Sequence, residues 1–377
     1  MKKENSLLIV IVSLLIFGLV VIANSTIISS TTLYKDPYKF AILQLSWIVL
    51  GLMGFFFFRR LNYKKLAKFS YVLFVITVLM LGILAFVGIL PCSTNLSFAP
   101  CVNGANRWLY LNPAPFPKIP FLGVLGFQPG ELAKLALILY LSFQLGKNLK
   151  EKRHVFLVYL ISSVVASGLI LLQPNMSTAA LVFLIGTIVY FASGASLKEL
   201  FVIFPTLVVV GAGSILFSPY RRSRLLTLIS GNSDSELGSG YHIKQILLAL
   251  GSGGFWGVGF GQSKQKFSYL PEVASDSIFA IIGEEFGFIG TTIVVSTFGY
   301  LIYRGFSIAK NCQDLTGKLL ATGIISWIGL QFFVNVAAMV KIIPLTGVPI
   351  PLISYGGSSM LFTLCALGIL ANIESQE

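Results

Sequence analysis

The chain has 377 residues, of which 55% are hydrophobic and only 11% are charged, with a mean hydropathy of +0.86. Soluble domains carry roughly 25% charged residues, so this composition excludes an ordinary soluble enzyme. The formal net charge of +13 would suggest a nucleic-acid partner in a soluble protein. In a membrane protein, basic cytoplasmic loops account for such a charge, so we expect no nucleic acid.

Long apolar segments predict an all-α polytopic membrane protein with about ten transmembrane helices, because about 20 apolar residues in helical form cross a bilayer. We expect its long outer loops to contain short or re-entrant helices. No segment reads as a separate soluble domain, so we expect one membrane domain over residues 1–377. The expected spans cover residues 6–28, 40–58, 70–91, 129–146, 155–173, 177–193, 200–217, 277–303, 319–340 and 358–372.

The basic residues predict how these spans are oriented. More than half of the 27 lysines and arginines lie near the N-terminus or in the loops that follow the second, fourth, sixth and eighth spans. The positive-inside rule places those loops in the cytoplasm. We therefore expect a multi-pass protein that contacts membrane lipids. Because ten spans is an even number, both termini are expected to lie on the same side, which is the cytoplasm.

The first long outer segment covers about residues 92–128. Cys92 and Cys101 lie on the outer face, where oxidation is possible, so either a disulfide or two free thiols fits the sequence. Arg107 precedes a tryptophan, and such a pair is commonly only a membrane anchor. Glu131 and Lys134 stand three residues apart at the start of the fourth span, so they either neutralise each other on one helix face or serve a site.

Gln173-Pro174-Asn175 separates the fifth and sixth spans and predicts an outer turn. Its polar groups either line a cavity or close the hairpin. A second long outer segment, about 218–276, contains an amphipathic helix at Tyr241–Leu250 that carries His242 and Lys244. The glycine-rich stretch that follows suggests the roof of a pocket, because irregular chain near membrane depth must line a cavity or be buried.

Seven cations lie in or near this outer segment and make it a candidate anion site, with a solvated loop at lipid headgroups as the alternative. They are Arg221, Arg222, Arg224, Lys244, Lys264, Lys266 and Lys341.

Asp276 is the sharpest candidate for chemistry, because an ionisable group beside a span is costly and usually functional. A carboxylate there, beside cations, could act as a general base. The structural alternative is an N-cap or first-turn carboxylate, although Ser275 could fill the cap. Glu284 and Glu285 follow on the same span and cannot both face the same cavity as Asp276, so we expect one to pair inside the bundle.

Pro344–Ser359 contains three prolines and three glycines in an apolar context. This pattern predicts a re-entrant loop on the outer side, with an ordinary outer loop as the alternative. Ser354 and Ser358 lie within it and are candidate substrate contacts.

Five motifs in this order resemble those of the SEDS proteins, the FtsW/RodA/SpoVE family of bacterial cell-wall synthesis. They are Gly104-Ala105-Asn106-Arg107-Trp108, Gln128-Pro129-Gly130-Glu131-Leu132-Ala133-Lys134, Gln173-Pro174-Asn175, the Leu270–Glu285 stretch and Pro344–Ser359. The resemblance implies a peptidoglycan glycosyltransferase of the bacterial cytoplasmic membrane that polymerises lipid II on the outer leaflet with a class B penicillin-binding protein. It implies that Asp276 is catalytic.

The same resemblance places Glu131 and Lys134 at the family's Glu and Lys positions. With Arg107, Asn175, His242, Lys244, Lys264, Ser354 and Ser358 they make up our candidate substrate-binding set. The chain departs from the family pattern at Gly130, usually Ser, and at Asn175 and Ser177, usually Asp and Gly. It also has Ala274, Ser275 and Ser277 around the aspartate, where His, Thr and Phe are usual.

Lipid II carries a pyrophosphate, two sugars and a polyprenyl tail, so its polymerase needs a base and cations. Asp276 would deprotonate the acceptor hydroxyl, and basic residues of the 218–276 segment, or a divalent cation (Mg²⁺ or Mn²⁺), would stabilise the leaving pyrophosphate. We expect no organic cofactor. A lipid II flippase and a non-catalytic scaffold for the penicillin-binding protein are the alternatives. The Gly-Gly-Ser-Ser sequence favours a division-type over an elongation-type member.

Overall fold

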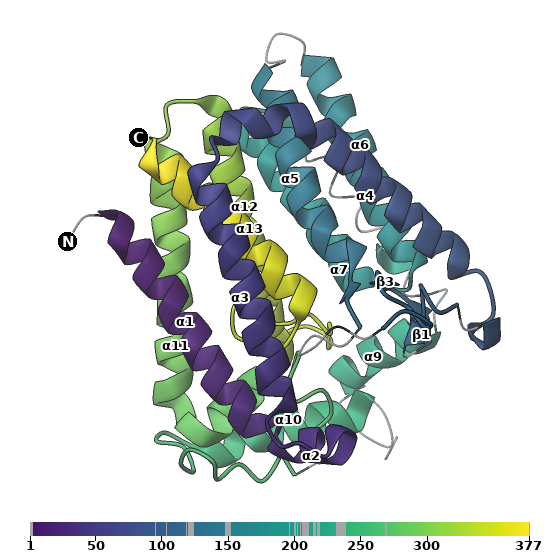
Figure 1. Cartoon of the computed structure of the whole chain (residues 1–377), viewed down its shortest axis with the longest axis vertical. Coiled ribbons are helices and arrows are strands. Elements are labelled where there is room, and N and C mark those ends of the chain that lie inside the picture. Colours follow the sequence, from purple (N-terminus) through teal and green to yellow (C-terminus); the bar gives the residue numbers. More distant parts are fainter. Residues whose placement is uncertain are drawn as a thin grey trace.

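The computed structural model is a bundle of long helices with both termini at one end (Figure 1). It describes the chain except for residues 1–2, 95, 103, 118, 120–123, 148–151, 196, 200, 202, 204, 206–210, 214–215, 217–218, 231–238, 268–269 and 377. The end that holds the termini is called the terminal end here. The opposite end, which carries the short helices α2, α9 and α10, is called the distal end (Figure 1).

Nine long helices build the bundle among the described residues: α1 (Lys3–Ser25), α3 (Lys39–Arg60), α4 (Ala67–Val87), α5 (Pro129–Lys147), α6 (Lys152–Leu172), α7 (Met176–Ala192), α11 (Ile278–Asn311), α12 (Leu315–Met339) and α13 (Gly357–Ser375). The short helices are α2 (Ile27–Tyr34), α9 (Pro219–Ser230) and α10 (Ser239–Gly253). Single 3-10 turns lie at Tyr63–Leu66, Cys92–Thr94 and Leu197–Glu199.

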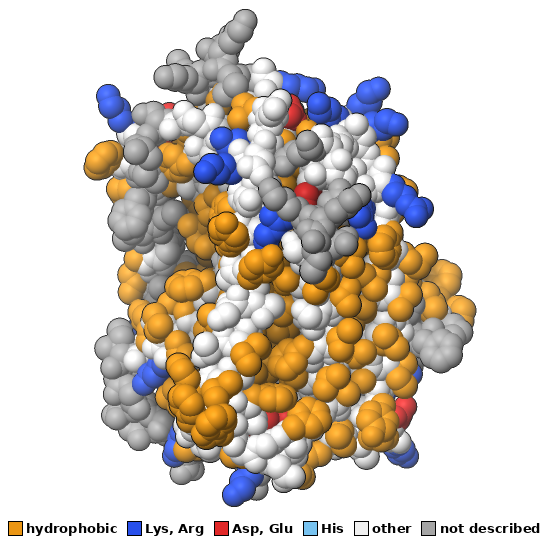
Figure 2. Space-filling view, turned by 90° about the vertical axis from the view of Figure 1, so that its left-hand side faces the viewer, with side chains coloured by type: hydrophobic (Ala, Val, Ile, Leu, Met, Phe, Trp, Pro, Cys, Tyr) orange, Lys and Arg blue, Asp and Glu red, His pale blue; other side chains and the backbone are white. Residues whose placement is uncertain are grey.

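Seven helices in the described part of the chain are long and apolar enough to cross a membrane, counting the turn at Tyr63–Leu66 with α4, and α7 is a shorter apolar helix. The face that carries α1 and α11 shows a broad hydrophobic surface, with basic side chains toward its two ends (Figure 2). These features confirm an all-α polytopic membrane protein. The expected spans at 129–146 and 177–193 are α5 and α7, and the span expected at 200–217 lies largely outside the described residues.

The segment between α4 and α5 contains the 3-10 turn at Cys92–Thr94 followed by short strands, whereas the short helices expected in the outer loops are found in the other long segment, as α9 and α10. Strand β1 (Cys101–Val102) pairs antiparallel with β2 (Ala105–Asn106), with Cys101 opposite Asn106. Strand β3 (Leu109–Tyr110) pairs antiparallel with β4 (Gly126–Phe127). A Cys92–Cys101 disulfide closes the first part of the segment. The disulfide interpretation of these cysteines is therefore confirmed.

The bundle is held together by close helix contacts at small residues. A Cβ on Gly368 of α13 would lie 2.4 Å from the Phe55 carbonyl oxygen of α3, so a larger side chain would push these helices apart. Membrane helices commonly associate in this way, because lipid offers no hydrophobic drive for their packing. The main cluster of buried residues includes side chains of α1, α3, α5, α11, α12 and α13. A second cluster includes side chains of α4, α5, α6 and α7.

Helix α11 is broken at Gly287, which has φ 64° and ψ −161°. The chain after α10 replaces the lost helical hydrogen bonds. Backbone N–H groups of 258–259 donate to the carbonyls of 284–285, and those of 288–289 donate to the carbonyls of 254–255, at 2.9 to 3.3 Å. The glycine-rich stretch is therefore a backbone partner of α11. A break in an apolar helix is tolerated only when the freed groups are satisfied in this way.

The chain between α12 and α13, called the 344–356 loop, contains no regular helix over its fully described length. Most of it is buried, including Ile350, Leu352 and Ile353. This agrees with an irregular segment that enters the bundle.

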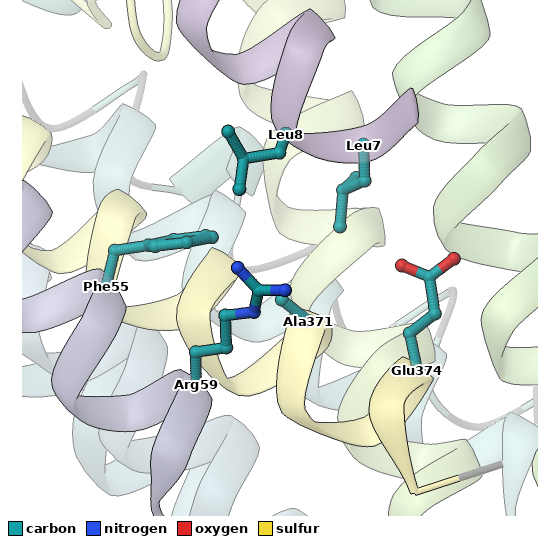
Figure 3. A pocket seen from close by; sticks show the side chains of 6 residues that line it. All are labelled: Leu7, Leu8, Phe55, Arg59, Ala371 and Glu374. Carbon is teal, nitrogen blue, oxygen red and sulfur yellow. The ribbon is translucent and has the colours of Figure 1, made fainter. Parts of the chain in front are cut away.

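At the terminal end, a small pocket lies between α1, α3 and α13 (Figure 3), lined by Leu7, Leu8, Phe55, Arg59, Ala371 and Glu374. It lies at the other end of the bundle from α10 and the start of α11.

Candidate functional site

Asp276 lies at the distal end, two residues before α11 begins, and is 7% exposed. Neither Asp276 nor Ser275 caps the helix, so both capping interpretations of the sequence are wrong. Ser277 occupies the N-cap position and makes no side-chain capping bond. The Ser275 hydroxyl lies 3.2 Å from Asp276 Oδ1 and 2.9 Å from a carboxylate oxygen of Glu272, so it bridges the two carboxylates. Asp276 is therefore a buried carboxylate without a helix-capping role.

The surroundings of Asp276 favour its protonated form. Burial raises its pKa from 3.8 to about 6, and the neighbouring Glu272 carboxylate acts in the same direction. Its own backbone, the Ser275 hydroxyl and the Arg224 guanidinium act in the opposite direction. A carboxylate with a pKa near the working pH is well suited to accept a proton in a reaction.

His242 on α10 meets the start of α11, because its Nε2 lies 2.7 Å from the Ser277 hydroxyl. Burial and the Arg224 guanidinium lower the pKa of His242 to about 4, against a backbone hydrogen bond with Pro271. The imidazole is therefore neutral at neutral pH and offers a hydrogen bond and no charge. Arg224 on α9 donates to the Leu345 carbonyl at 2.6 Å. Its guanidinium lowers the pKa of both His242 and Asp276, so a cation lies near these two side chains.

Glu131 and Lys134 form the expected ion pair at the start of α5, with Lys134 Nζ 2.6 Å from Glu131 Oε1. Both are buried, at 4% and 1% exposure. Lys134 also lies over the Trp327 ring, 5.3 Å from its centroid. The second Glu131 oxygen has no hydrogen-bond partner among the described residues. A buried ion pair is poor evidence for stability, because desolvation offsets its attraction.

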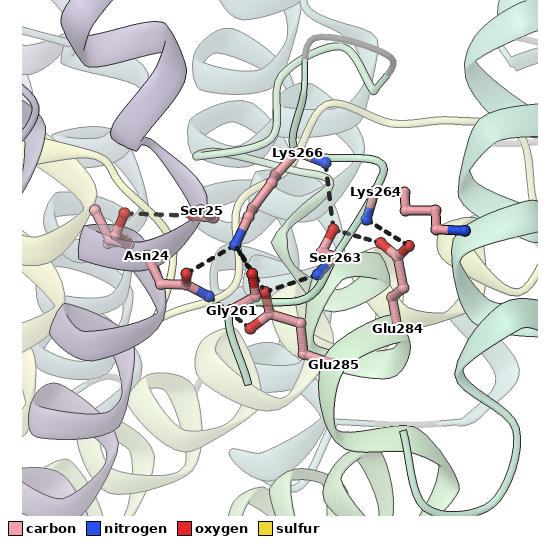
Figure 4. Close-up of polar contacts among 9 residues, drawn as sticks. Asn24, Ser25, Gly261, Ser263, Lys264, Lys266, Glu284 and Glu285 are labelled. Carbon is pink, nitrogen blue, oxygen red and sulfur yellow. Dashed lines mark hydrogen bonds and ion pairs between the residues drawn. The ribbon is translucent and has the colours of Figure 1, made fainter. Parts of the chain in front are cut away.

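Glu284 and Glu285 are both buried, and one of them, Glu285, forms an ion pair, as expected (Figure 4). Glu284 accepts hydrogen bonds from the Ser263 hydroxyl and the Lys264 backbone N–H. Glu285 pairs with Lys266 at 3.4 Å and accepts a hydrogen bond from Asn24 of α1 at 2.6 Å. All these partners are donors, so the cluster fastens the 261–266 segment to α1 and α11.

The remaining predicted residues fall into three groups. Arg107 donates to the carbonyls of 173–174, and Asn175 caps α7, so these two meet at the expected turn. Lys244 and Lys264 have exposed side chains. The two serines take part in the loop structure: Ser354 Oγ accepts from the backbone N–H of Ile350, and Ser358 Oγ accepts from that of Gln128.

Three residues near Asp276 and Lys134 were absent from the predicted site, namely Glu272, Gln331 and Asn335, whereas Arg224 belongs to the predicted cationic segment. Glu272 and Arg224 act on Asp276 electrostatically, and Gln331 and Asn335 contact Lys134 and the Asp276 backbone. A usable signal existed for the last two, since two amides four residues apart are unusual in an apolar span.

No group of three His, Cys, Asp or Glu side chains with metal-binding placement occurs in the described part of the chain. Near the candidate base, Glu272 and Asp276 supply carboxylate oxygens on either side of Ser275. Such hard oxygen ligands suit Mg²⁺ or Mn²⁺, and Mg²⁺ is often held by one or two carboxylates together with substrate phosphates. The donor chemistry therefore fits a divalent cation that shares the substrate.

Fold and site define a multi-pass helical membrane protein with a buried carboxylate at its distal end. The family model of the FtsW/RodA/SpoVE cell cycle proteins matches residues 5–377. Stage V sporulation protein E of Bacillus subtilis is 34% identical over 99% of this chain and 98% of its own length. A probable peptidoglycan glycosyltransferase FtsW of Thioalkalivibrio sulfidiphilus is 33% identical over 100% of this chain and 90% of its own.

Solved structures agree with these relatives. A chain from a peptidoglycan synthase complex has a TM-score of 0.75 at 25% identity, covering 98% of this chain and 97% of that chain. The rod shape determining protein RodA of Thermus thermophilus has a TM-score of 0.68 at 25% identity, covering 98% and 96%. The chain belongs to the FtsW/RodA/SpoVE family.

Proposed function

We propose that this protein is a peptidoglycan glycosyltransferase that polymerises lipid II into β-1,4-linked glycan, in cell division or in the maintenance of cell shape. The observation that carries the proposal is Asp276, a buried carboxylate with a pKa of about 6 at the distal end. Family membership and the names of the FtsW relatives support the reaction class.

In this mechanism Asp276 takes the proton of the acceptor's GlcNAc 4-hydroxyl. The hydroxyl oxygen attacks C1 of the donor's MurNAc, the bond from C1 to the pyrophosphate oxygen breaks, and the proton stays on Asp276. Inversion at C1 gives the β-1,4 link and releases undecaprenyl pyrophosphate. A base at this pKa contributes about 10²–10⁴-fold in rate.

The leaving pyrophosphate needs positive charge and hydrogen bonds. Arg224 lies beside the carboxylate, and the exposed Lys244 and Lys264 are available to an anionic headgroup. His242 is neutral and contributes a hydrogen bond. Glu272 would be the residue to hold Mg²⁺ or Mn²⁺ near the substrate, and the cation would neutralise phosphate charge while Asp276 stays the base. The Glu131–Lys134 pair completes the proposed substrate site.

The proposed setting is the bacterial cytoplasmic membrane, with both termini in the cytoplasm and the distal end outside. The basic loops that follow α3 and α5 support this orientation. A class B penicillin-binding protein is the proposed partner, since one structural relative comes from a complex that coordinates polymerization and crosslinking.

The test is glycan polymerisation from purified lipid II by the full chain, with and without the partner. Wild type should polymerise and Asp276→Ala should not. Full activity in Asp276→Ala would overturn the assignment of the base. Lipid II transport between leaflets without polymer, unaffected by Asp276→Ala, would instead establish a flippase. Normal growth of an Asp276→Ala strain, but not of a deletion strain, would establish a scaffold.

A further inference from the structure

Two amide side chains lie four residues apart on α12, Gln331 and Asn335, and therefore share one face of the helix. They are 0% and 1% exposed. A buried amide costs free energy unless it is hydrogen-bonded, and more so in an apolar helix. Each must therefore be accounted for by what it contacts.

Gln331 contacts the ion pair of α5. Its Oε1 accepts hydrogen bonds from Lys134 Nζ at 2.7 Å and from Trp327 Nε1 at 2.8 Å. Its Nε2 donates to the Pro349 carbonyl at 2.9 Å. Both contacts at the oxygen come from groups that can only donate, so the orientation of the amide is fixed.

Asn335 makes the matching contacts one turn further along. Its Nδ2 donates to the carbonyls of Asp276 and Val348, each at 2.7 Å. Carbonyls can only accept, so this amide also has one orientation. Its Oδ1 is buried and has no hydrogen-bond partner among the described residues. A side chain that served stability alone would have both of its polar atoms paired, because buried polar atoms in folded proteins nearly always have a hydrogen-bond partner.

The 344–356 loop joins the two sets of contacts. Val348 and Pro349 are consecutive, so the two amides bind adjacent carbonyls of one stretch of chain. A Cβ on the preceding Gly347 would lie 3.8 Å from Asp276 Oδ2, so this stretch packs against the carboxylate. The Tyr355 N–H donates to the carbonyl of Ala274 at 2.8 Å. A continuous path thus runs from Lys134 to Asp276.

We propose that Gln331 and Asn335 are positioning residues that hold Lys134 and Asp276 in one fixed relation through the 344–356 loop. The inference rests on the proposed function and deepens it, since it makes the ion pair of α5 and the base before α11 parts of a single site. Neither amide is assigned contact with substrate. Loss of either amide lets the base and the ion pair drift relative to each other, and such displacement costs rate more than binding.

The chain supplies a matched control in Gln44 of α3, which is 1% exposed. Gln44 Nε2 donates to the Ser354 carbonyl at 3.2 Å, and its Oε1 accepts from the Gly356 N–H at 3.4 Å. It therefore holds the same loop but contacts neither Lys134 nor Asp276. Gln331→Met, Asn335→Leu and Gln44→Met each remove one buried amide that holds the loop.

The experiment measures kcat and KM for lipid II polymerisation by the full chain, together with the unfolding midpoint. Gln331→Met and Asn335→Leu should lower kcat about 10- to 100-fold and leave KM within about threefold. Gln44→Met should keep kcat within about threefold at a similar loss of midpoint. Should Asn335→Leu not fold, Asn335→Ser, which keeps one donor, should lower kcat by an intermediate factor.

The Gln331→Met/Asn335→Leu double variant should lose little more kcat than the worse single variant, because both act through one loop. A multiplied loss would show that the amides act separately. An equal kcat loss in Gln44→Met would show a merely structural role, and either result would overturn the inference. If Asn335→Leu is fully active while Asp276→Ala is inactive, the positioning role of the amides is overturned and the proposed function stands. If the wild type has no polymerase activity, the proposed function is overturned as well.

Discussion

A Cβ on Gly287 would lie 2.3 Å from the backbone nitrogen of Gly257, so the break in α11 and the chain after α10 meet backbone to backbone. Gly287 also has a positive φ of 64°. Both features require glycine at this position.

Gly287→Ala should therefore lower the free energy of unfolding by more than about 2 kcal/mol, through backbone strain and loss of the exchanged hydrogen bonds. Gly299→Ala on the same helix is the control, because its Cβ would meet no atom within 4 Å. That change should be neutral or stabilise by up to about 1 kcal/mol. Thermal unfolding in detergent measures both, and equal midpoints would contradict this account of the break.

The rate of polymerisation should depend on pH through Asp276. A base acts in its ionised form, so activity should fall about tenfold per pH unit below the pKa of about 6. Arg224 lowers that pKa, so Arg224→Gln should move the acidic limb of the pH–rate profile, which is the fall in rate at low pH, to higher pH. Lys244→Gln, which removes an exposed cation from α10, should leave the limb where it is. A limb that stays near pH 4 in wild type would contradict the buried base.

Asp276→Asn should make the protein inactive and more stable. The folded state raises the pKa of this carboxyl from 3.8 to about 6, so ionisation costs folding free energy. This cost is absent below pH 3.8, grows as pH rises toward 6, and stays at about 2–3 kcal/mol above it. The variant should therefore unfold at a higher temperature than wild type at pH 8, with a smaller gain at pH 5. A lower midpoint at pH 8 would contradict the cost of the buried charge.

The Glu131–Lys134 pair separates stability from function. Lys134→Met leaves a buried carboxylate without its cation and should destabilise by about 3–5 kcal/mol. Glu131→Gln/Lys134→Met removes both charges and should recover most of that stability. If the pair serves the substrate, the double variant stays inactive although it is folded. Recovery of polymerisation together with the unfolding midpoint would show that the pair is only structural.

The sequence was informative where one physical rule dominates. Apolar length located the long helices, and an amphipathic pattern located α10 around His242 and Lys244. The spacing of Glu131 and Lys134 predicted their pairing, because residues three apart share a helix face. Two cysteines on one outer segment allowed either a disulfide or two free thiols, and the structure shows the disulfide.

Contacts between distant segments could not be predicted in the same way. Asn335 reaches Asp276 across 59 residues, and Gln331 reaches Lys134 across 197. No local period encodes such meetings. The capping interpretation of Asp276 failed because Ser277 takes the N-cap position and turns toward His242 instead. The break at Gly287 was not predicted, because the expected span at 277–303 runs straight through it and a single glycine does not by itself mark a kink.

The most direct measurement of the central claim is the initial rate of glycan polymerisation from purified lipid II at pH 7.5 (about neutral, above the Asp276 pKa of about 6). Asp276→Asn is compared there with Asp36→Asn, which makes the same chemical change between α2 and α3. The account predicts loss of at least about 100-fold for Asp276→Asn and near-wild-type rates for Asp36→Asn. Equal rates in wild type and Asp276→Asn would contradict it.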